Sequence, residues 1–188
     1  MNLSRFPEHL PPTGRKRRLR LLPILLALLG LTLGGLWMLG EKSAPTLESR
    51  ATGGPKEKAP DFILKDLEGQ QFRLSDHREK RPVLIIFSTT WCTFCESEIP
   101  HFKSLHAKYG QQGLEIVNID IRESQTKVAS FAAQHQLPYQ ILLDEDATVS
   151  RIYEILGVPS LVLVGKDGII VCRQCQNVEA LVEEALKE

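Results

Sequence analysis

Two cysteines separated by two residues, Cys92 and Cys95, are the side chains of this sequence with the clearest chemical reactivity. They follow an apolar run at 83–87, which is short enough to be a β-strand buried on both faces. From Cys92 onward, apolar residues recur at helical spacing, so we expect both thiols where this strand leads into a helix. Residues three apart share one helix face, which places the two sulfurs close enough to form a disulfide.

The start of a helix is a favourable place for a reactive thiol. Its free N–H groups and the positive end of its dipole stabilise an anion, and the thiolate is the nucleophilic form of cysteine. Cys92 lies nearer the helix end and is therefore the better attacking thiol, while Cys95 is the resolving thiol. A pair of core cysteines or half of a metal site is the alternative, which the strand–turn–helix context disfavours.

The elements that must position this pair alternate along the chain. Short apolar segments alternate with segments of helical periodicity, and an Asp-Gly turn joins the last two expected strands. This order indicates an α/β fold, a mixed β-sheet with helices on both faces. We predict strands at 62–64, 71–74, 83–87, 114–121, 140–143, 161–164 and 169–171, and helices at 93–109, 123–135, 147–156 and 178–186.

Three further segments precede this domain. Residues 1–20 contain six Lys and Arg residues and one Glu, and residues 21–40 form an uncharged, leucine-rich stretch long enough to be a transmembrane helix. The positive charge before this stretch predicts a cytoplasmic head and an exported domain, with a cleaved signal peptide as the alternative. Residues 41–58 are rich in Pro, Gly and charged residues, so we expect a flexible linker to a domain at 59–188.

The charge of the chain excludes one class of partner. The formal net charge is zero, but residues 59–188 contain 13 Lys and Arg residues against 19 Asp and Glu residues, a net charge of −6. An acidic domain argues against nucleic acid as a partner. The five histidines are isolated or spaced off a common helix face, so the sequence gives no reason to assign a metal or a cofactor.

Several ordered motifs carry a family resemblance. They are Trp-Cys-Thr-Phe-Cys at 91–95, continued by Glu98 and Pro100, together with Ala-Pro-Asp-Phe from 59, Leu-Lys-Asp-Leu-Glu-Gly from 64 and Leu-Ser-Asp from 74. They resemble the thioredoxin superfamily, and in particular its membrane-anchored TlpA/ResA-type branch. This resemblance implies a thioredoxin-like fold and an enzyme, a protein disulfide oxidoreductase held at the cell membrane with its catalytic domain on the extracytoplasmic side.

The resemblance also implies three substrate-binding residues. Pro159 is expected to form a cis peptide bond with Val158, although most X-Pro bonds are trans. The backbone of Val158 would then line the groove that binds an extended substrate peptide. Trp91 is expected to lie on the surface around the active site, with a core position as the alternative.

Glu98 is the predicted acid–base residue. On a straight helix it lies on roughly the same side as Cys95, which must lose a proton before it attacks, and a partly buried carboxylate suits that task. The aspartate that thioredoxin buries beneath its active site would fall at Ile86, which cannot titrate, and this absence resembles the TlpA/ResA branch. An ordinary surface glutamate is the alternative.

A second pair, Cys172 and Cys175, is absent from the family pattern. In an extended strand their Cα atoms would lie about 10 Å apart, too far for a disulfide, whereas a turn after Cys172 would bring them together. A structural disulfide, a second redox pair and a zinc site built from all four thiols are the three alternatives.

The family resemblance implies a reductive function. The expected substrates are protein disulfides, for example the cysteine pair of an apocytochrome c during cytochrome c maturation, and a membrane thiol electron donor would re-reduce the enzyme. One alternative is a copper-site assembly factor or metallochaperone, although such proteins usually space their cysteines more widely and add a histidine. The other is a thiol peroxidase, whose reactive cysteine lies in a different local motif.

Overall fold

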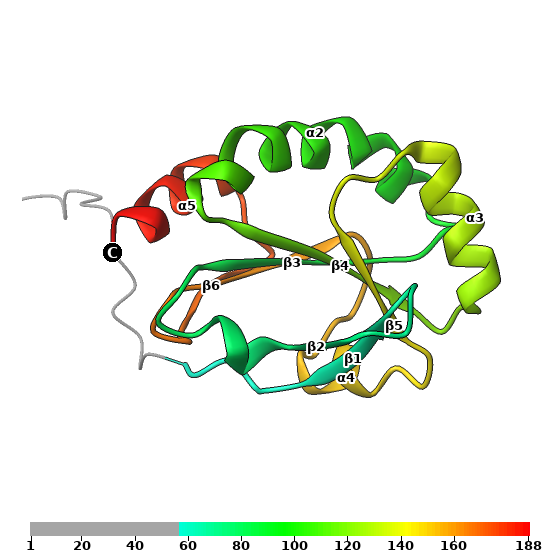
Figure 1. Cartoon of the computed structure of the whole chain (residues 1–188), viewed down its shortest axis with the longest axis horizontal. Coiled ribbons are helices and arrows are strands. Elements are labelled where there is room, and N and C mark those ends of the chain that lie inside the picture. The colour runs from blue at the N-terminus through cyan, green and yellow to red at the C-terminus, as the bar shows by residue number, and fades with distance from the viewer. Residues whose placement is uncertain (1–56) are drawn as a thin grey trace, which may run out of the picture. The chain divides into compact units, whose positions relative to one another are not determined.

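The strand that precedes the two cysteines, β3 (Val83–Ser88), lies inside a seven-stranded mixed sheet. In this computed structural model, which describes residues 57–188, the strand order is β2-β1-β5-β4-β3-β6-β7 (Figure 1). β3 pairs in parallel with β4 (Glu115–Ile121) and antiparallel with β6 (Ser160–Val164). Each side chain from 83 to 87 is at most 2% exposed, which confirms a strand buried on both faces.

The other strands extend the sheet to its two edges. β5 (Gln140–Asp144) is parallel to β4 and antiparallel to β1 (Ile63–Asp66), which forms a hairpin with the edge strand β2 (Gln71–Arg73). At the opposite edge, β7 (Ile170–Arg173) pairs antiparallel with β6. The predicted α/β fold with a mixed sheet is confirmed.

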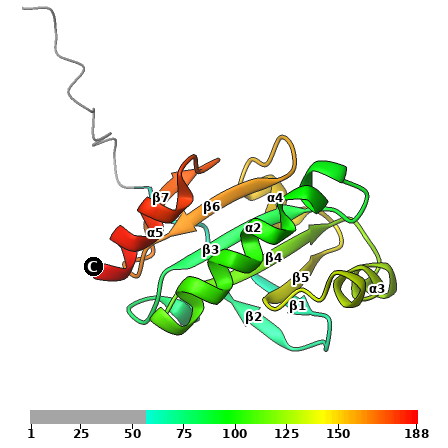
Figure 2. The same cartoon turned by 90° about the horizontal axis from the view of Figure 1, so that it is seen from above.

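One face of the sheet is covered by the helix that carries the cysteines. α2 (Thr93–Tyr109) and α5 (Val178–Lys187) lie over this face in both views (Figure 1 and Figure 2). They pack on Leu84 and Ile86 of β3 through apolar side chains that form one buried cluster: Phe102, Leu105, Tyr109, Val178, Val182 and Ala185. α3 (Gln125–His135) packs beside them on β5 through a smaller cluster around its Val128.

The opposite face buries the alternate side chains of β3. Val83, Ile85 and Phe87 pack there against the N-terminal hairpin, the short helix η1 (Leu74–His77) and α4 (Thr148–Ile152). Because successive side chains of a strand point to opposite faces, β3 contributes to both halves of the core. It therefore fixes where the cysteine-bearing helix begins.

One predicted helix is shorter than expected. The prediction was 147–156, but α4 ends at Ile152, because Glu154 adopts a left-handed φ of 55° that a helix cannot contain. The chain then passes Leu156, which is 93% exposed, on its way to Val158. The predicted bounds of the other helices and strands agree with the structure within two residues.

The predicted N-terminal head, the transmembrane helix at 21–40 and most of the linker lie outside the described residues. Within 57–188, no helix combines the length and the apolar character needed to cross a bilayer.

β4 buries two polar side chains at alternate positions. Asn118 and Asp120 are 7% and 3% exposed. The Oδ1 atom of Asn118 accepts a hydrogen bond of 2.8 Å from the Ser88 hydroxyl, whereas Oδ1 of Asp120 is buried and has no partner among the described residues. Burial, and then the nearby Glu123 carboxylate, raise the pKa of Asp120 to about 8.

We expect this carboxyl to make the stability of the oxidised domain depend on pH. When unfolded it ionises near its ordinary pKa of 3.8, and when folded only near about 8, so stability is greatest below the lower value and decreases as pH rises towards the upper one. The loss is on the order of a few kcal/mol. Between pH 4 and pH 8, the free energy of unfolding in urea should change less with pH in Asp120→Asn than in the wild type. Equal slopes for the two proteins would contradict a raised pKa at Asp120.

Candidate active site

The two cysteines lie at the junction of β3 and α2, as the sequence predicts. Cys92 is the N-cap residue of α2, with φ −84° and ψ 101°, and Cys95 lies in the first turn. The backbone N–H of Cys95 donates a hydrogen bond of 3.0 Å to the sulfur of Cys92. This sulfur therefore lies at the positive end of the helix, where negative charge on it is stabilised.

The pair forms a disulfide surrounded by exposed apolar side chains. The Cα atoms of Cys92 and Cys95 are 5.2 Å apart, and the two residues are 9% and 5% exposed. Their neighbours Trp91 and Phe94 are 69% and 66% exposed, so Trp91 is a surface residue and not part of the core. The buried disulfide thus lies within an apolar surface that is open to solvent.

The loop before β6 contacts the same disulfide. The Val158–Pro159 peptide bond is cis, as the resemblance implies. The carbonyl oxygen of Val158 lies 3.6 Å from the sulfur of Cys92. Within the loop, the Ser160 hydroxyl donates a hydrogen bond of 2.6 Å to the carbonyl oxygen of Gly157. The fold therefore brings residues 157–160 against the N-terminus of α2.

A groove of about 490 Å³ runs alongside α2 from this loop. Its walls are the first half of α2, the loop around Pro159 and the segment that joins β7 to α5. Across it, Nδ1 of His101 in α2 lies 3.6 Å from a carboxylate oxygen of Glu179 in α5. Val158 and Glu98 both line this groove, so the structure brings them together with the exposed Phe94.

Glu98 and Cys95 line different cavities. Glu98 lines the groove, whereas Cys95 lines a small cavity of about 20 Å³ between α2 and the sheet. The polar residues around this small cavity are Ser88, Thr89, Asn118, Asp120 and Tyr139. Ile86, the position of the thioredoxin aspartate, is fully buried in the apolar core.

Next to this cavity is a pair of acidic residues that the sequence patterns did not indicate. Glu123 is 9% exposed, accepts hydrogen bonds of 2.5 and 2.7 Å from the N–H and hydroxyl of Thr90, and forms an ion pair with Lys127. Burial acts to raise its pKa, but the hydrogen bonds from Lys127 and Thr90 outweigh it and lower the pKa. Glu123 is thus an ionised neighbour of Asp120. The sequence feature that could have indicated this pair is the presence of polar residues, Asn118 and Asp120, inside a strand that is expected to be central.

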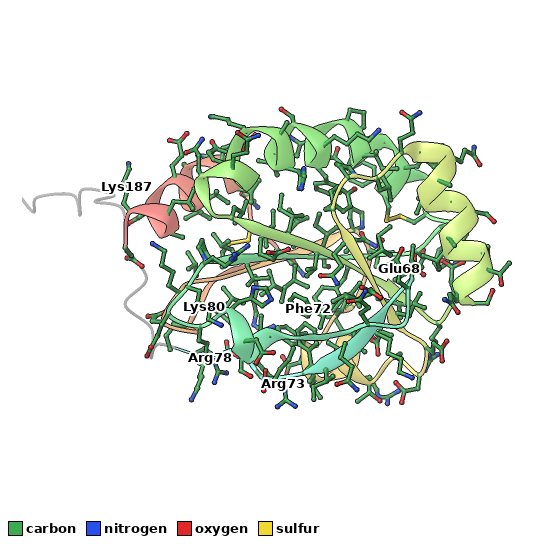
Figure 3. All side chains as sticks on the ribbon, viewed as in Figure 1. Glu68, Phe72, Arg73, Arg78, Lys80 and Lys187 are labelled. Carbon is green, nitrogen blue, oxygen red and sulfur yellow. A yellow bond between two sulfur atoms is a disulfide. The ribbon has the colours of Figure 1, made fainter. Side chains whose placement is uncertain are left out.

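The second cysteine pair also forms a disulfide. β7 ends at Arg173 and Gln174 adopts a left-handed φ of 49°, so the chain turns as the disulfide requires. The Cα atoms of Cys172 and Cys175 are 5.4 Å apart, and Figure 3 shows the two disulfides as separate yellow bonds. Both residues pack against the core cluster under α2 and α5, and Cys175 also lines the groove.

Comparison with known proteins assigns the chain to a family. The sequence matches the AhpC/TSA family over residues 55–173. The thiol-disulfide oxidoreductase ResA of Geobacillus thermodenitrificans is 36% identical over 148 residues, which cover 79% of this chain and 79% of that protein. ResA of Bacillus thuringiensis subsp. konkukian is 32% identical over 133 residues, which cover 70% of this chain and 76% of that protein.

Solved structures share the fold. One from Bacteroides thetaiotaomicron, described as a candidate protein disulfide isomerase, matches with a TM-score of 0.63 and 30% identity, over 71% of this chain and 90% of that one. Another, from Chlorobium tepidum and described as a candidate thiol:disulfide interchange protein DsbE, matches with a TM-score of 0.65 and 25% identity, over 70% of this chain and 96% of that one.

The family match spans more than half of the chain, and it includes the helix start that carries the two cysteines. The relatives that are more than 30% identical are named for thiol–disulfide exchange, the chemistry that this Cys-x-x-Cys pair can perform. The chain belongs to the AhpC/TSA family and is a thioredoxin-like thiol–disulfide oxidoreductase of the ResA type.

Proposed function

We propose that the chain reduces protein disulfides, with Cys92 as the attacking thiol and Cys95 as the resolving thiol. The observation that carries this proposal is the place of the Cys92 sulfur at the N-cap of α2, where the N–H of Cys95 donates to it. This N–H and the positive end of the helix dipole stabilise the Cys92 thiolate relative to its thiol, whereas within residues 57–188 no hydrogen bond reaches the Cys95 sulfur.

The reaction has two exchange steps. In the first, the Cys92 thiolate attacks one sulfur of the substrate disulfide, and the other substrate sulfur leaves as a thiolate. In the second, Cys95 loses its proton and attacks the sulfur of Cys92, which releases the first substrate sulfur as a thiolate. The substrate is reduced to two thiols, and the enzyme ends with the Cys92–Cys95 disulfide.

The groove is the proposed binding site for an extended stretch of the substrate protein. The carbonyl oxygen of Val158 lies next to Cys92, where it can accept a backbone hydrogen bond from a peptide strand. Trp91 and Phe94 offer exposed apolar area to the residues that flank the substrate cysteine. We retain Pro159 as a residue of this site and Glu98 as its proposed acid–base residue, because both line the groove.

The Cys95→Ser variant should trap a substrate. Cys92 can still attack, but nothing resolves the product, so a mixed disulfide between Cys92 and a cysteine-containing substrate peptide accumulates. The measurement is the mass of the adduct before and after reduction. The matched Cys92→Ser variant keeps the buried thiol and should form little adduct. Equal trapping by both variants would contradict the assigned roles, and stronger trapping by Cys92→Ser would reverse them.

The proposed direction is reductive, with the cysteine pair of an apocytochrome c as substrate and a membrane thiol electron donor that re-reduces Cys92–Cys95. The resemblance to the TlpA/ResA branch supports this choice. For Cys172–Cys175 we propose a structural role, because the pair packs against the core and closes the turn after β7.

Mass-tagging of the thiols across a graded redox buffer tests both proposals. The Cys92–Cys95 potential should lie near that of thioredoxin, about −270 mV, and a structural Cys172–Cys175 pair should stay oxidised to below about −300 mV. A Cys92–Cys95 potential near about −120 mV would instead make the protein a disulfide donor. If Cys172–Cys175 titrated together with Cys92–Cys95, the second pair would take part in the redox reaction.

We further propose that residues 21–40 anchor the protein in the cell membrane, with the domain on the extracytoplasmic side. An uncharged stretch of this length after a basic segment supports the proposal. The full chain should therefore remain in the membrane fraction after a high-salt wash, and removal of residues 1–40 should release it. Protease added to spheroplasts, which lack the outer layers of the cell, should digest the domain. A domain protected from this protease, or a full chain found in the soluble fraction, would contradict the proposed anchor.

A further inference from the structure

We propose that Asp120 is the proton acceptor for the Cys95 thiol, through one water molecule held in the small cavity that both residues line. This inference rests on the proposed function, because it concerns the step in which Cys95 resolves the mixed disulfide. It adds a second acid–base residue on the buried side of Cys95, since Glu98, proposed above, lines the open groove and not this cavity.

The cavity has the size and the polar groups of a water site. Its volume is about 20 Å³. Holding one water takes about 10–15 Å³ and two or more polar partners. Oδ1 of Asp120 and Oγ1 of Thr89 are both buried, and neither has a hydrogen-bond partner within residues 57–188. Because buried polar atoms are nearly always hydrogen-bonded, a water bound to these two oxygens is the simplest way to satisfy them.

Cys95 needs a base that can reach its buried thiol from the small cavity. It is 5% exposed, and burial disfavours the thiolate that must form before Cys95 attacks. The Asp120 carboxyl is nearby in the same cavity, and its pKa of about 8 is close to that of an ordinary thiol, about 8.5. The raised pKa of Asp120 lies closer to that of a buried thiol than the pKa of an ordinary carboxyl does, which lowers the free-energy cost of the proton transfer.

The proton also has a way out to solvent. The ionised Glu123 is the charged neighbour of Asp120, and its partner Lys127 has a side chain that is 56% exposed. The remaining titratable group around the cavity is Tyr139, whose pKa burial raises to about 12, so it stays protonated. Because the pKa of Glu123 is lowered, Glu123 does not keep a proton and serves only as a relay between Asp120 and solvent.

The step balances as follows. The S–H bond of Cys95 breaks, and its proton passes through the water to the Asp120 carboxylate. The Cys95 thiolate attacks the sulfur of Cys92, the bond between Cys92 and the substrate sulfur breaks, and the substrate sulfur leaves with the electron pair. Cys92 and Cys95 are oxidised to the disulfide, and the substrate is reduced.

A single turnover with the aromatic disulfide DTNB separates the two exchange steps. The reduced full-length chain, in excess over DTNB, releases one coloured thiolate when Cys92 attacks and a second when Cys95 resolves. In Asp120→Asn the second release should be about 100-fold slower and lose its pH dependence between about pH 6 and pH 9, while the first stays within about twofold. In the matched Asp76→Asn variant, which makes the same change at an exposed carboxylate of η1 on the opposite face of the sheet, the second release should keep its wild-type rate.

Three outcomes would overturn the inference. They are an unchanged second release in Asp120→Asn, an equal slowing of both releases in that variant, and the same loss of the second release in Asp76→Asn. Thr89→Val, which removes a water ligand but no charge, provides an independent check and should slow only the second release. If the wild type released a single thiolate per DTNB, the proposed function itself would fail, whatever these variants do.

Discussion

The burial of β3 on both faces is the constraint on which the rest of the structure depends. Leu84 and Ile86 hold the layer of α2 and α5, while Val83, Ile85 and Phe87 hold the opposite layer. A strand fixed from both sides ends at a defined point, and the turn that follows has little freedom. The N-terminus of α2, and with it the sulfur of Cys92, is therefore positioned by the core and not by the active site alone.

The core also gives two chemically identical side chains different environments. Cys92 meets the N–H groups of a helix start and a carbonyl oxygen at the edge of the groove. Cys95, one turn further in, meets a small cavity that contains a carboxyl with a raised pKa. The helix end favours charge on the first sulfur, and burial favours the neutral form of the second, which supports the proposed order of the two exchange steps.

Much of this arrangement could be predicted from the sequence. The apolar run at 83–87 and the helical spacing after Cys92 placed the junction correctly, because both are local patterns that determine one element each. The cis bond before Pro159 could not come from local physics, which favours trans, and was expected from the resemblance alone.

The parts that local patterns did not predict depend on packing between distant segments. The side-chain pattern predicts that α4 continues to residue 156, but the left-handed backbone at Glu154 ends the helix earlier. Asp120 alternates with apolar neighbours, which is typical of a strand with one face in water; the layer formed by α2 and α3 buries it instead. Asp120 and Cys95 are far apart in the sequence, so no local pattern could predict that they line the same cavity.

The groove is built from three segments that are far apart in the chain, and only one of them carries the reactive pair. The wall between β7 and α5 is held by its own disulfide, whereas the contact with the Cys92 sulfur comes from Val158 in another wall. If the groove binds a polypeptide as proposed, mutations in that wall can change which polypeptide fits without disturbing the start of α2. Related proteins can thus differ in partner choice while they share the same thiol chemistry, with the exposed groove residues Gln174 and Asn177 as the positions most free to change.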